Sequence, residues 1–197
     1  AENGTEGVFT EEDMDAILNQ FISYMRDGSD EEIQDTDINM LLQELVVQFK
    51  PLDIRFKAED IPVIQARSLS LKRLIGNLIN NSKRYGAEPI ELSAKVENDH
   101  IFISVADHGE GIPEDQIEDL MQPFVRGNEA RTVQGSGLGL AIVKRIVDIH
   151  QGQLTLHNRP EGGLEAVISL PLLVESEEES QTSNPIQKIK QTLSDRF

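Results

Sequence analysis

The chain has 197 residues, 38% of them hydrophobic, which is enough for one domain with a packed core and additional segments. It contains no cysteine, which excludes a disulfide framework and a thiolate metal site and is typical of a reducing compartment. Its formal net charge of −17 argues against nonspecific binding to nucleic acid or to anionic membranes. No apolar run is long enough for a membrane span, and no signal peptide is visible at the first residue.

The N-terminal part carries much of the negative charge, because residues 1–37 hold twelve Asp or Glu against Arg26 alone. Residues 1–9 predict a loop or frayed end, and residues 29–36 predict an acidic linker. Between them, residues 10–28 predict a helix with coiled-coil spacing of its apolar side chains: Met14, Leu18, Phe21 and Met25. This helix packs either on the adjoining domain or, as we favour, against a second helix of a hairpin or dimer.

Residues 37–172 predict the main domain. Three segments with the helical period of apolar residues predict helices: 38–49, 68–84 and the segment after Gly137. Six short apolar or alternating segments predict strands: 53–58, 62–66, 90–96, 101–106, 153–157 and 164–170. Residues 113–134 predict irregular structure with one helical turn at most. The expected fold is an α/β two-layer sandwich, a mixed sheet covered on one face by three helices.

The C-terminal part, residues 173–197, predicts an acidic and largely disordered tail, because Glu and Ser dominate its first half. A short helix that docks on a partner stays open as an alternative, since four apolar residues share helical spacing: Ile186, Ile189, Leu193 and Phe197.

A polar stripe follows the edge of the apolar face of the predicted helix 68–84. Asn77, Asn81 and Arg84 fall within it, with Tyr85 beside it. Asn is unfavourable in the middle of a helix, so two amides one turn apart indicate a role. Amide oxygens are neutral, hard ligands suited to a Mg²⁺ ion that keeps its waters and bridges phosphates. The alternative is two solvated Asn residues.

An acidic glycine turn, Asp107-His-Gly109-Glu-Gly111-Ile112, ends the predicted strand 101–106. An ionised carboxylate only accepts hydrogen bonds, so Asp107 can bind the exocyclic amine of adenine but offers nothing to guanine O6. Gly109 and Gly111 let a base lie close to the backbone, and Ile112 can cover one face of the ring. A plain turn between strand and loop is the alternative.

A long loop with few apolar anchors leads from this turn to the last helix. Such a loop is typical of a lid or of a disordered segment. Phe124 is its apolar anchor, and Arg126 and Arg131 are cations that can meet terminal phosphates or be merely solvated. If residues 121–136 form a lid, they are mobile without nucleotide and protected with it.

A glycine run opens the last helix of the predicted domain. Gly135, Gly137 and Gly139 stand at every second position, and Leu138 and Leu140 alternate with them. Glycines at a helix start let backbone N–H groups approach phosphate oxygens, and the helix dipole favours negative charge there. The run is neither a P-loop, because no Gly-Lys-Ser/Thr follows, nor a dinucleotide fingerprint, because Leu140 replaces the third glycine.

Taken in order, these four motifs resemble the N, G1, F and G2 boxes of sensor histidine kinases, whose ATP-binding sandwich is shared with Hsp90, MutL and type II topoisomerases. The resemblance covers about residues 37–172. Two segments are most similar in sequence to the EnvZ-type osmosensor kinases: residues 122–127, Gln-Pro-Phe-Val-Arg-Gly, and residues 137–143, Gly-Leu-Gly-Leu-Ala-Ile-Val. Residues 10–28 resemble the end of the second dimerisation helix of that group.

The resemblance implies a Bergerat-type fold that binds ATP or ADP with Mg²⁺. It implies that Asn81 holds the metal, that Asp107 binds the adenine amine and that Tyr85 lies at the edge of the base. The phosphates would meet the backbone of the glycine run, with Arg84 in support. The candidate catalytic residues at the phosphate end are Asn77, Arg126 and Arg131.

One feature of the family is absent. The phosphoacceptor histidine normally stands in a His-Glu/Asp-Leu-Arg/Thr-x-Pro context on the first dimerisation helix, and none of the four histidines has it: His100, His108, His150 and His157. We therefore expect a fragment that begins after that helix and binds ATP without phosphorylating itself. The whole protein is expected to be a homodimeric inner-membrane sensor with its catalytic part in the cytoplasm, and an OmpR-like response regulator is the expected partner.

Two other functions stay open. A GHKL-type ATPase or chaperone module should carry a catalytic Glu one turn from the metal ligand, where this chain has Asn77. A nucleotide-sensing binding module would bind ATP without phosphotransfer. We expect neither nucleic acid nor a membrane to bind this part of the protein.

Overall fold

A computed structural model describes residues 18, 21–22, 25, 28, 30–123, 125 and 137–172 of the chain. A five-stranded mixed sheet forms its centre, in the order β2 (Ile54–Ala58), β4 (Ile90–Glu97), β5 (His100–Ala106), β7 (Leu164–Pro171) and β6 (Gln153–Asn158). Strand β2 pairs with β4 in parallel, whereas the other three pairings are antiparallel.

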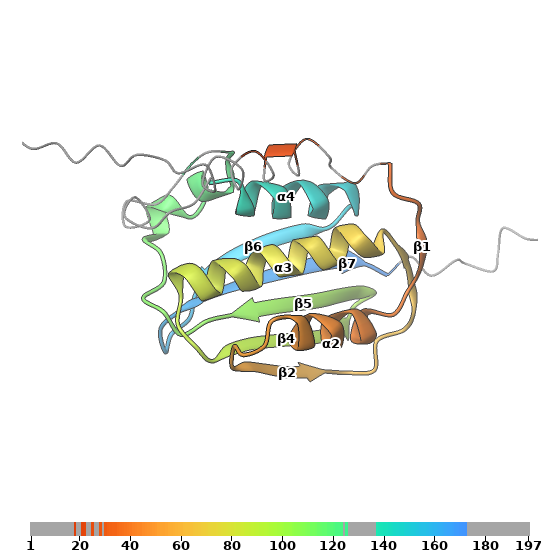
Figure 1. Cartoon of the computed structure of the whole chain (residues 1–197), viewed down its shortest axis with the longest axis horizontal. Helices are drawn as coiled ribbons and strands as arrows, with labels where there is room; N and C mark the ends of the chain where they lie inside the picture. Colours follow the sequence, from red (N-terminus) through yellow and green to blue (C-terminus); the bar gives the residue numbers. More distant parts are fainter. Residues whose placement is uncertain are drawn as a thin grey trace, which may run out of the picture.

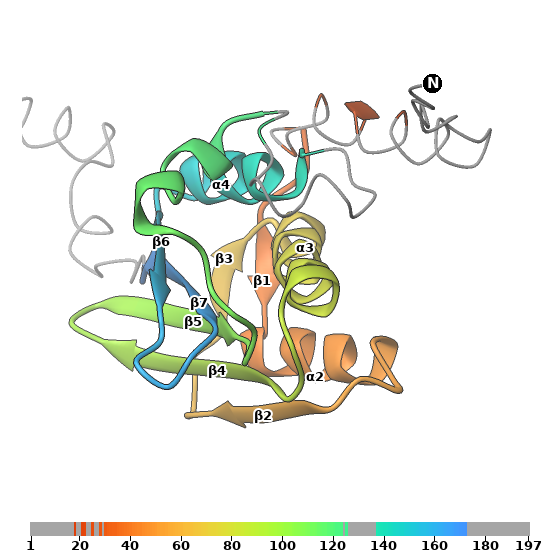
Figure 2. The same ribbon diagram turned by 90° about the vertical axis from the view of Figure 1, so that its left-hand side faces the viewer.

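Three helices cover one face of this sheet (Figures 1 and 2): α2 (Ile38–Gln48), α3 (Ser68–Tyr85) and α4 (Gly139–Ile149). Every second strand residue packs toward them, as Ile101, Ile103 and Val105 do from β5, and each of these is at most 2% exposed. Helix α2 begins where Asp37 accepts a hydrogen bond from the Met40 backbone N–H at 2.9 Å. The predicted α/β two-layer sandwich is confirmed.

The sheet differs from the expectation at one place. The predicted strand 62–66 is β3 (Ile64–Ala66), and it lies outside the five-stranded sheet. It pairs antiparallel with β1 (Gln34–Thr36), a strand inside the segment that the sequence indicated as linker. Two three-residue strands are too short for a recognisable alternation, and their pairing depends on contacts between segments thirty residues apart.

The segment 113–134, expected to be irregular, contains two single 3₁₀ turns in its described part: η1 (Glu114–Gln116) and η2 (Asp119–Met121). Turn η2 lies beside α4, and Met121 packs on the core. In the predicted helix 10–28, Leu18, Phe21, Ile22 and Met25 are helical, with 42% to 61% of their surface exposed. The tail 173–197 lies outside the described residues, and no described helix has the length and apolar character of a membrane span.

Helix α3 begins at a contact with the segment that precedes the domain. Its N-cap residue, Arg67, makes no side-chain cap. Instead the Glu31 carboxylate accepts hydrogen bonds from the backbone N–H groups of Leu69 and Ser70, at 2.7 and 2.9 Å, and from the Ser70 hydroxyl at 2.7 Å. A carboxylate from far earlier in the sequence thus satisfies the first N–H groups of this helix.

Candidate functional site

Asp107 lies directly after β5 and is 5% exposed. Its Oδ1 accepts hydrogen bonds from the backbone N–H groups of Gly109, at 2.9 Å, and Leu164, at 3.2 Å. The main chain of Asp107 also pairs with that of Leu164, because the Asp107 N–H donates to the Leu164 carbonyl at 3.0 Å. Oδ2 accepts no hydrogen bond from any described residue, so one oxygen of a fixed, buried carboxylate stays available to a ligand.

The end of α3 meets this carboxylate. A Cβ atom on Gly86 would lie 2.3 Å from Asp107 Cγ and 2.6 Å from Oδ2, so no larger residue fits there without a shift. The His108 N–H donates to the Ala87 carbonyl at 3.0 Å and ties the two loops together. Tyr85, directly before Gly86, is 46% exposed, and Arg84 is exposed too. Both predicted residues therefore lie at the same end of α3 as Asp107.

Asn81 and the glycine run come together where α3 packs against α4. A Cβ atom on Gly139 would lie 3.1 Å from Asn81 Oδ1. The Asn81 amide is partly exposed and has no hydrogen-bond partner among the described residues. Asn77, one turn earlier, donates from Nδ2 to the Arg73 carbonyl at 2.9 Å, so part of its amide is engaged on its own helix.

Helix α4 begins without a capping side chain. Leu138 is its N-cap residue, and no described side chain accepts a hydrogen bond from the N–H groups of Gly139, Leu140 or Ala141. Gly137 has φ +70°, which favours glycine. The Leu138 side chain is fully buried and Leu140 packs on the core, so either residue can meet a ligand only through its backbone or, for Leu140, its exposed part.

The loop that carries Gly109, Gly111 and Ile112 is held by residues 158–163, which are the last residue of β6 and the turn that leads to β7. The Asn158 amide makes two hydrogen bonds to the Ile112 backbone, accepting from its N–H at 2.8 Å and donating to its carbonyl at 2.7 Å. Gly111 has φ +81°, and its Cβ would lie 2.5 Å from Asn158 Oδ1. The close approach of these segments explains the glycine.

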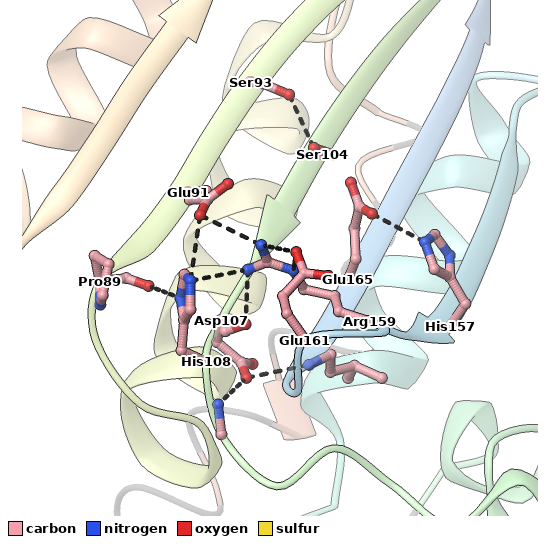
Figure 3. A network of polar contacts seen from close by, with 12 residues as sticks. Pro89, Glu91, Ser93, Ser104, Asp107, His108, His157, Arg159, Glu161 and Glu165 are labelled. Carbon is pink, nitrogen blue, oxygen red and sulfur yellow. Dashed lines mark hydrogen bonds and ion pairs between the residues drawn. The ribbon is translucent and has the colours of Figure 1, made fainter.

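Arg159 joins this turn to the other side of Asp107 (Figure 3). Its Nη1 donates to the Asp107 carbonyl at 3.0 Å and lies 3.4 Å from His108 Nε2, and its Nη2 contacts Glu91 at 3.4 Å and Glu161 at 2.6 Å. Burial lowers the pKa of the Arg159 guanidinium, but the hydrogen bonds and charges of Glu161 and Glu91 outweigh that effect and raise it. Arg159 is therefore a permanent cation behind the site.

His108 belongs to the same network. Its Nδ1 lies 2.8 Å from the Pro89 carbonyl, which can only accept, so Nδ1 carries the proton. Its Nε2 then faces Glu91 at 3.3 Å and Arg159. His108 thus fixes the turn from behind and does not point toward Asn81 or Gly139 as a catalytic group.

Four predicted site residues, Phe124, Arg126, Arg131 and Gly135, and most of the expected lid lie outside the described residues. The other three histidines are engaged within the domain. His100 begins β5 and His157 lies in β6, where its Nε2 contacts Glu165 at 2.9 Å. His150 caps the C-terminus of α4, with both ring nitrogens hydrogen-bonded to backbone.

Sequence reasoning missed Gly86, Asn158, Arg159 and Gly163. Gly163 has φ +98°, and its Cβ would lie 1.9 Å from the Asp107 carbonyl oxygen. The run Asn-Arg-Pro-Glu-Gly-Gly between two alternating strands signals a turn. Its role became visible only with the strand order, which places β7 beside β5 and brings the turn to Asp107.

The site therefore combines a buried hydrogen-bond acceptor at one end with a neutral amide and an uncapped helix start at the other. The first suits a purine amine, and the second suits phosphate oxygens with a hydrated divalent cation. This is the order of groups that an adenine nucleotide presents.

Comparisons with known proteins agree with this arrangement. Residues 66–174 match the family described as histidine kinase-, DNA gyrase B-, and HSP90-like ATPase. The sensor histidine kinase GtrS of Pseudomonas aeruginosa is 36% identical over 148 residues, which are 73% of this chain and 30% of GtrS. The chain thus spans less than a third of that curated relative.

Solved structures with the same fold include the histidine kinase domain of the E. coli osmosensor EnvZ. Its TM-score is 0.57 at 36% identity, and the match covers 78% of this chain and 94% of that structure. Full-length ShkA in complex with AMPPNP has a TM-score of 0.71 over 81% of this chain and 36% of ShkA, but at 24% identity it supports the fold alone.

The family match covers more than half of the chain, and the relatives that it resembles are sensor histidine kinases. The chain belongs to the histidine kinase-, DNA gyrase B- and HSP90-like ATPase family, as the ATP-binding catalytic domain of a sensor histidine kinase.

Proposed function

We propose that this chain binds Mg²⁺-ATP and presents its γ-phosphoryl group to a histidine on another segment or subunit, from which it passes to a response regulator. The observation that carries the proposal is the Asp107 carboxylate. It is 5% exposed and fixed through Oδ1, and Oδ2 lacks a partner among the described residues. An oxygen that only accepts, held in a fixed orientation, matches the amine that adenine presents.

At the phosphate end, Asn81 fits the role of a magnesium ligand. Its amide oxygen is neutral, partly exposed and without a described partner, and it lies beside the first residue of α4. A Mg²⁺ ion bound there would neutralise the negative charge that develops on the phosphates. The N–H groups at the start of α4 would bind phosphate oxygens, because the helix dipole makes that end positive.

The transfer itself needs little chemistry from this domain. A neutral imidazole attacks the γ-phosphorus in line, its N–P bond forms as the bond to the bridging oxygen breaks, and ADP leaves with that oxygen. Positioning and charge neutralisation supply the catalysis. Asn77 stands where an ATPase would need a carboxylate base, and it donates to Arg73 O, so its place favours transfer over hydrolysis.

The acceptor histidine belongs to a segment other than this domain, because each of the four histidines lies in a strand, a turn or a helix C-cap. The exposed apolar residues Leu18, Phe21 and Met25 fit a dimerisation helix in a homodimer. By similarity to the membrane-bound sensor class, the chain would be the cytoplasmic portion of an inner-membrane kinase with an OmpR-like partner.

Calorimetry of ADP and GDP binding with Mg²⁺ tests the nucleotide assignment. The chain should bind ADP at least about tenfold more tightly than GDP, the value of a misplaced hydrogen bond in a buried site. Asp107→Asn should lose this preference and most of the affinity, whereas Glu110→Gln, an exposed carboxylate in the same loop, should change neither. Equal ADP and GDP affinities for the parent would overturn the assignment.

Transfer is tested separately with γ-labelled ATP. Alone, these 197 residues should gain no acid-labile, base-stable phosphate. Adding a protein that carries the dimerisation helices should produce weak labelling of that protein, because the effective concentration of an untethered acceptor is low. Labelling of this chain alone would show that one of its own histidines accepts the phosphoryl group.

A further inference from the structure

Residues 158–163, the last residue of β6 and the turn that leads to β7, hold the loop that follows Asp107. That loop, residues 107–113, has no helix or strand of its own and carries the predicted adenine contacts. Without external support, ordering such a loop around a ligand would lower the affinity, because each residue fixed on binding loses conformational entropy.

Asn158 supports the distal half of the loop. It is the last residue of β6, and its side chain leaves the strand on the same side as Leu154 and Leu156, which face the helices. The amide oxygen and nitrogen bond both polar groups of the Ile112 backbone, at 2.8 and 2.7 Å. One side chain thus replaces the pairing that a neighbouring strand would provide.

Arg159 and Gly163 support the proximal half. Arg159 directly follows β6, and Figure 3 shows its guanidinium reaching the Asp107 carbonyl, which it binds at 3.0 Å. Gly163, with φ +98°, packs directly against the same carbonyl. The two halves of the loop are therefore fixed by two successive residues, Asn158 and Arg159.

We infer that Asn158 is a positioning residue for nucleotide binding, acting through the Gly111–Ile112 backbone and not by touching the nucleotide. This inference rests on the proposed function. It differs from a contact role, because the Ile112 backbone engages both the oxygen and the nitrogen of the Asn158 amide. Its contribution is to keep the adenine end ordered before the ligand arrives, which lowers the entropic penalty of binding.

The test compares Asn158→Ala, Asn158→Asp and a control. Loss of both hydrogen bonds in Asn158→Ala should weaken ADP binding roughly tenfold. Asn158→Asp keeps an acceptor for the Ile112 N–H but sets a carboxylate against the Ile112 carbonyl, so it should weaken binding at least as much. Gln153→Ala, at the exposed start of the same strand, should leave the affinity unchanged.

Two further measurements separate positioning from a general structural effect. Adenosine, which has no phosphates, should lose affinity for Asn158→Ala by the same factor as ADP, because the defect lies at the adenine end. Amide exchange at Ile112 in the nucleotide-free protein should accelerate in both Asn158 variants and not in Gln153→Ala, while urea unfolding shows all variants folded. An ADP affinity of Asn158→Ala within twofold of the parent, or unchanged Ile112 exchange, would overturn the inference. If the parent itself fails to prefer ADP over GDP, it is the proposed function that fails.

Discussion

Helices α3 and α4 pack side by side on the sheet, yet they begin in opposite ways. The first N–H groups of α3 are satisfied by the Glu31 carboxylate, with Leu69 N at 2.7 Å and Ser70 N at 2.9 Å. No described side chain caps the start of α4, where Gly139 stands beside the Asn81 amide, which has no hydrogen-bond partner among the described residues. Neither helix has an acidic residue in its own first turn.

This difference indicates which of the two helix starts binds an anionic ligand. Both helix starts carry the positive end of a dipole, which favours a negative charge. At α3 the chain supplies that charge from Glu31, so the anion serves stability. At α4 no described side chain caps the first turn, which lies beside a neutral amide, and this is the arrangement that a phosphate ligand needs. The contrast between the two helices is thus an internal argument for the phosphate end of the site.

The largest effect should follow from giving α4 its own anion. Gly139→Asp places a carboxylate at the helix start and beside Asn81, where it would compete with the phosphates. We expect ADP affinity to fall about 100-fold or more, with stability nearly unchanged because the dipole favours the new charge. Gly139→Ala is the matched control: its methyl group would lie 3.1 Å from Asn81 Oδ1, so it should weaken binding only a few-fold. Equal losses in the two variants would refute a phosphate site at α4.

The reverse change removes the anion from α3. Glu31→Ala leaves Leu69 N, Ser70 N and the Ser70 hydroxyl without their acceptor, and the free energy of unfolding in urea should fall by about 1–2 kcal/mol. Glu31→Gln keeps an oxygen acceptor without the charge and should lose roughly half as much. ADP affinity should stay at the parental value in both variants, because the Glu31 contact serves stability. A change in ADP affinity would contradict the separation between a stabilising anion at α3 and a ligand anion at α4.

A smaller effect is expected at the amide between the helices. Asn81→Ala should reduce nucleotide affinity about tenfold at low Mg²⁺ and less as Mg²⁺ is raised, because the amide is one of few protein ligands to an otherwise hydrated ion. Calorimetry across a magnesium titration measures this, with Asn80→Ala, an exposed neighbour on the same helix, as the control. Parallel titrations for Asn81→Ala and the parent would make Asn81 a solvated residue only.

Most of the fold could be predicted from periodicity. Helices α2, α3 and α4 and the hairpin of β4 and β5 lie within a few residues of their expected ranges, because each is long and has a strongly apolar face. The pair of β1 and β3 could not be predicted in the same way. Three residues per strand leave no periodic signal, and the pairing depends on tertiary contacts.

The site residues that belong to short sequence motifs could be predicted. Those whose position depends on the strand order could not. Asn81, Asp107 and Gly139 came from separate motifs, and only packing shows that Asn81 and Gly139 adjoin. Asn158 and Arg159 lie fifty residues from the loop that they hold, in a segment that reads as an ordinary turn. Their contacts exist because β7 lies between β5 and β6, which no local pattern encodes.

The smallest expected effect is a pH dependence at the start of α3. His150 Nδ1 donates to the Ile146 carbonyl at 2.8 Å, so Nε2 carries a lone pair and accepts the Arg67 N–H at 3.2 Å. Burial lowers the pKa of His150 below its ordinary value of 6.5, and this effect exceeds the raising effect of the Ile146 hydrogen bond; the Arg67 charge lowers the pKa further, and the Glu31 charge raises it least. The unfolded chain then binds the proton more readily than the folded one. Stability from this group is complete above about pH 6.5 and is lost as the pH falls toward the folded pKa.

Urea unfolding between about pH 7.5 and 5.5 should therefore show a drop in the free energy of unfolding. This drop should be smaller in His150→Gln, by less than about 1 kcal/mol. Identical pH slopes for parent and variant would mean that His150 can charge in place, and that the Arg67 N–H does not depend on it.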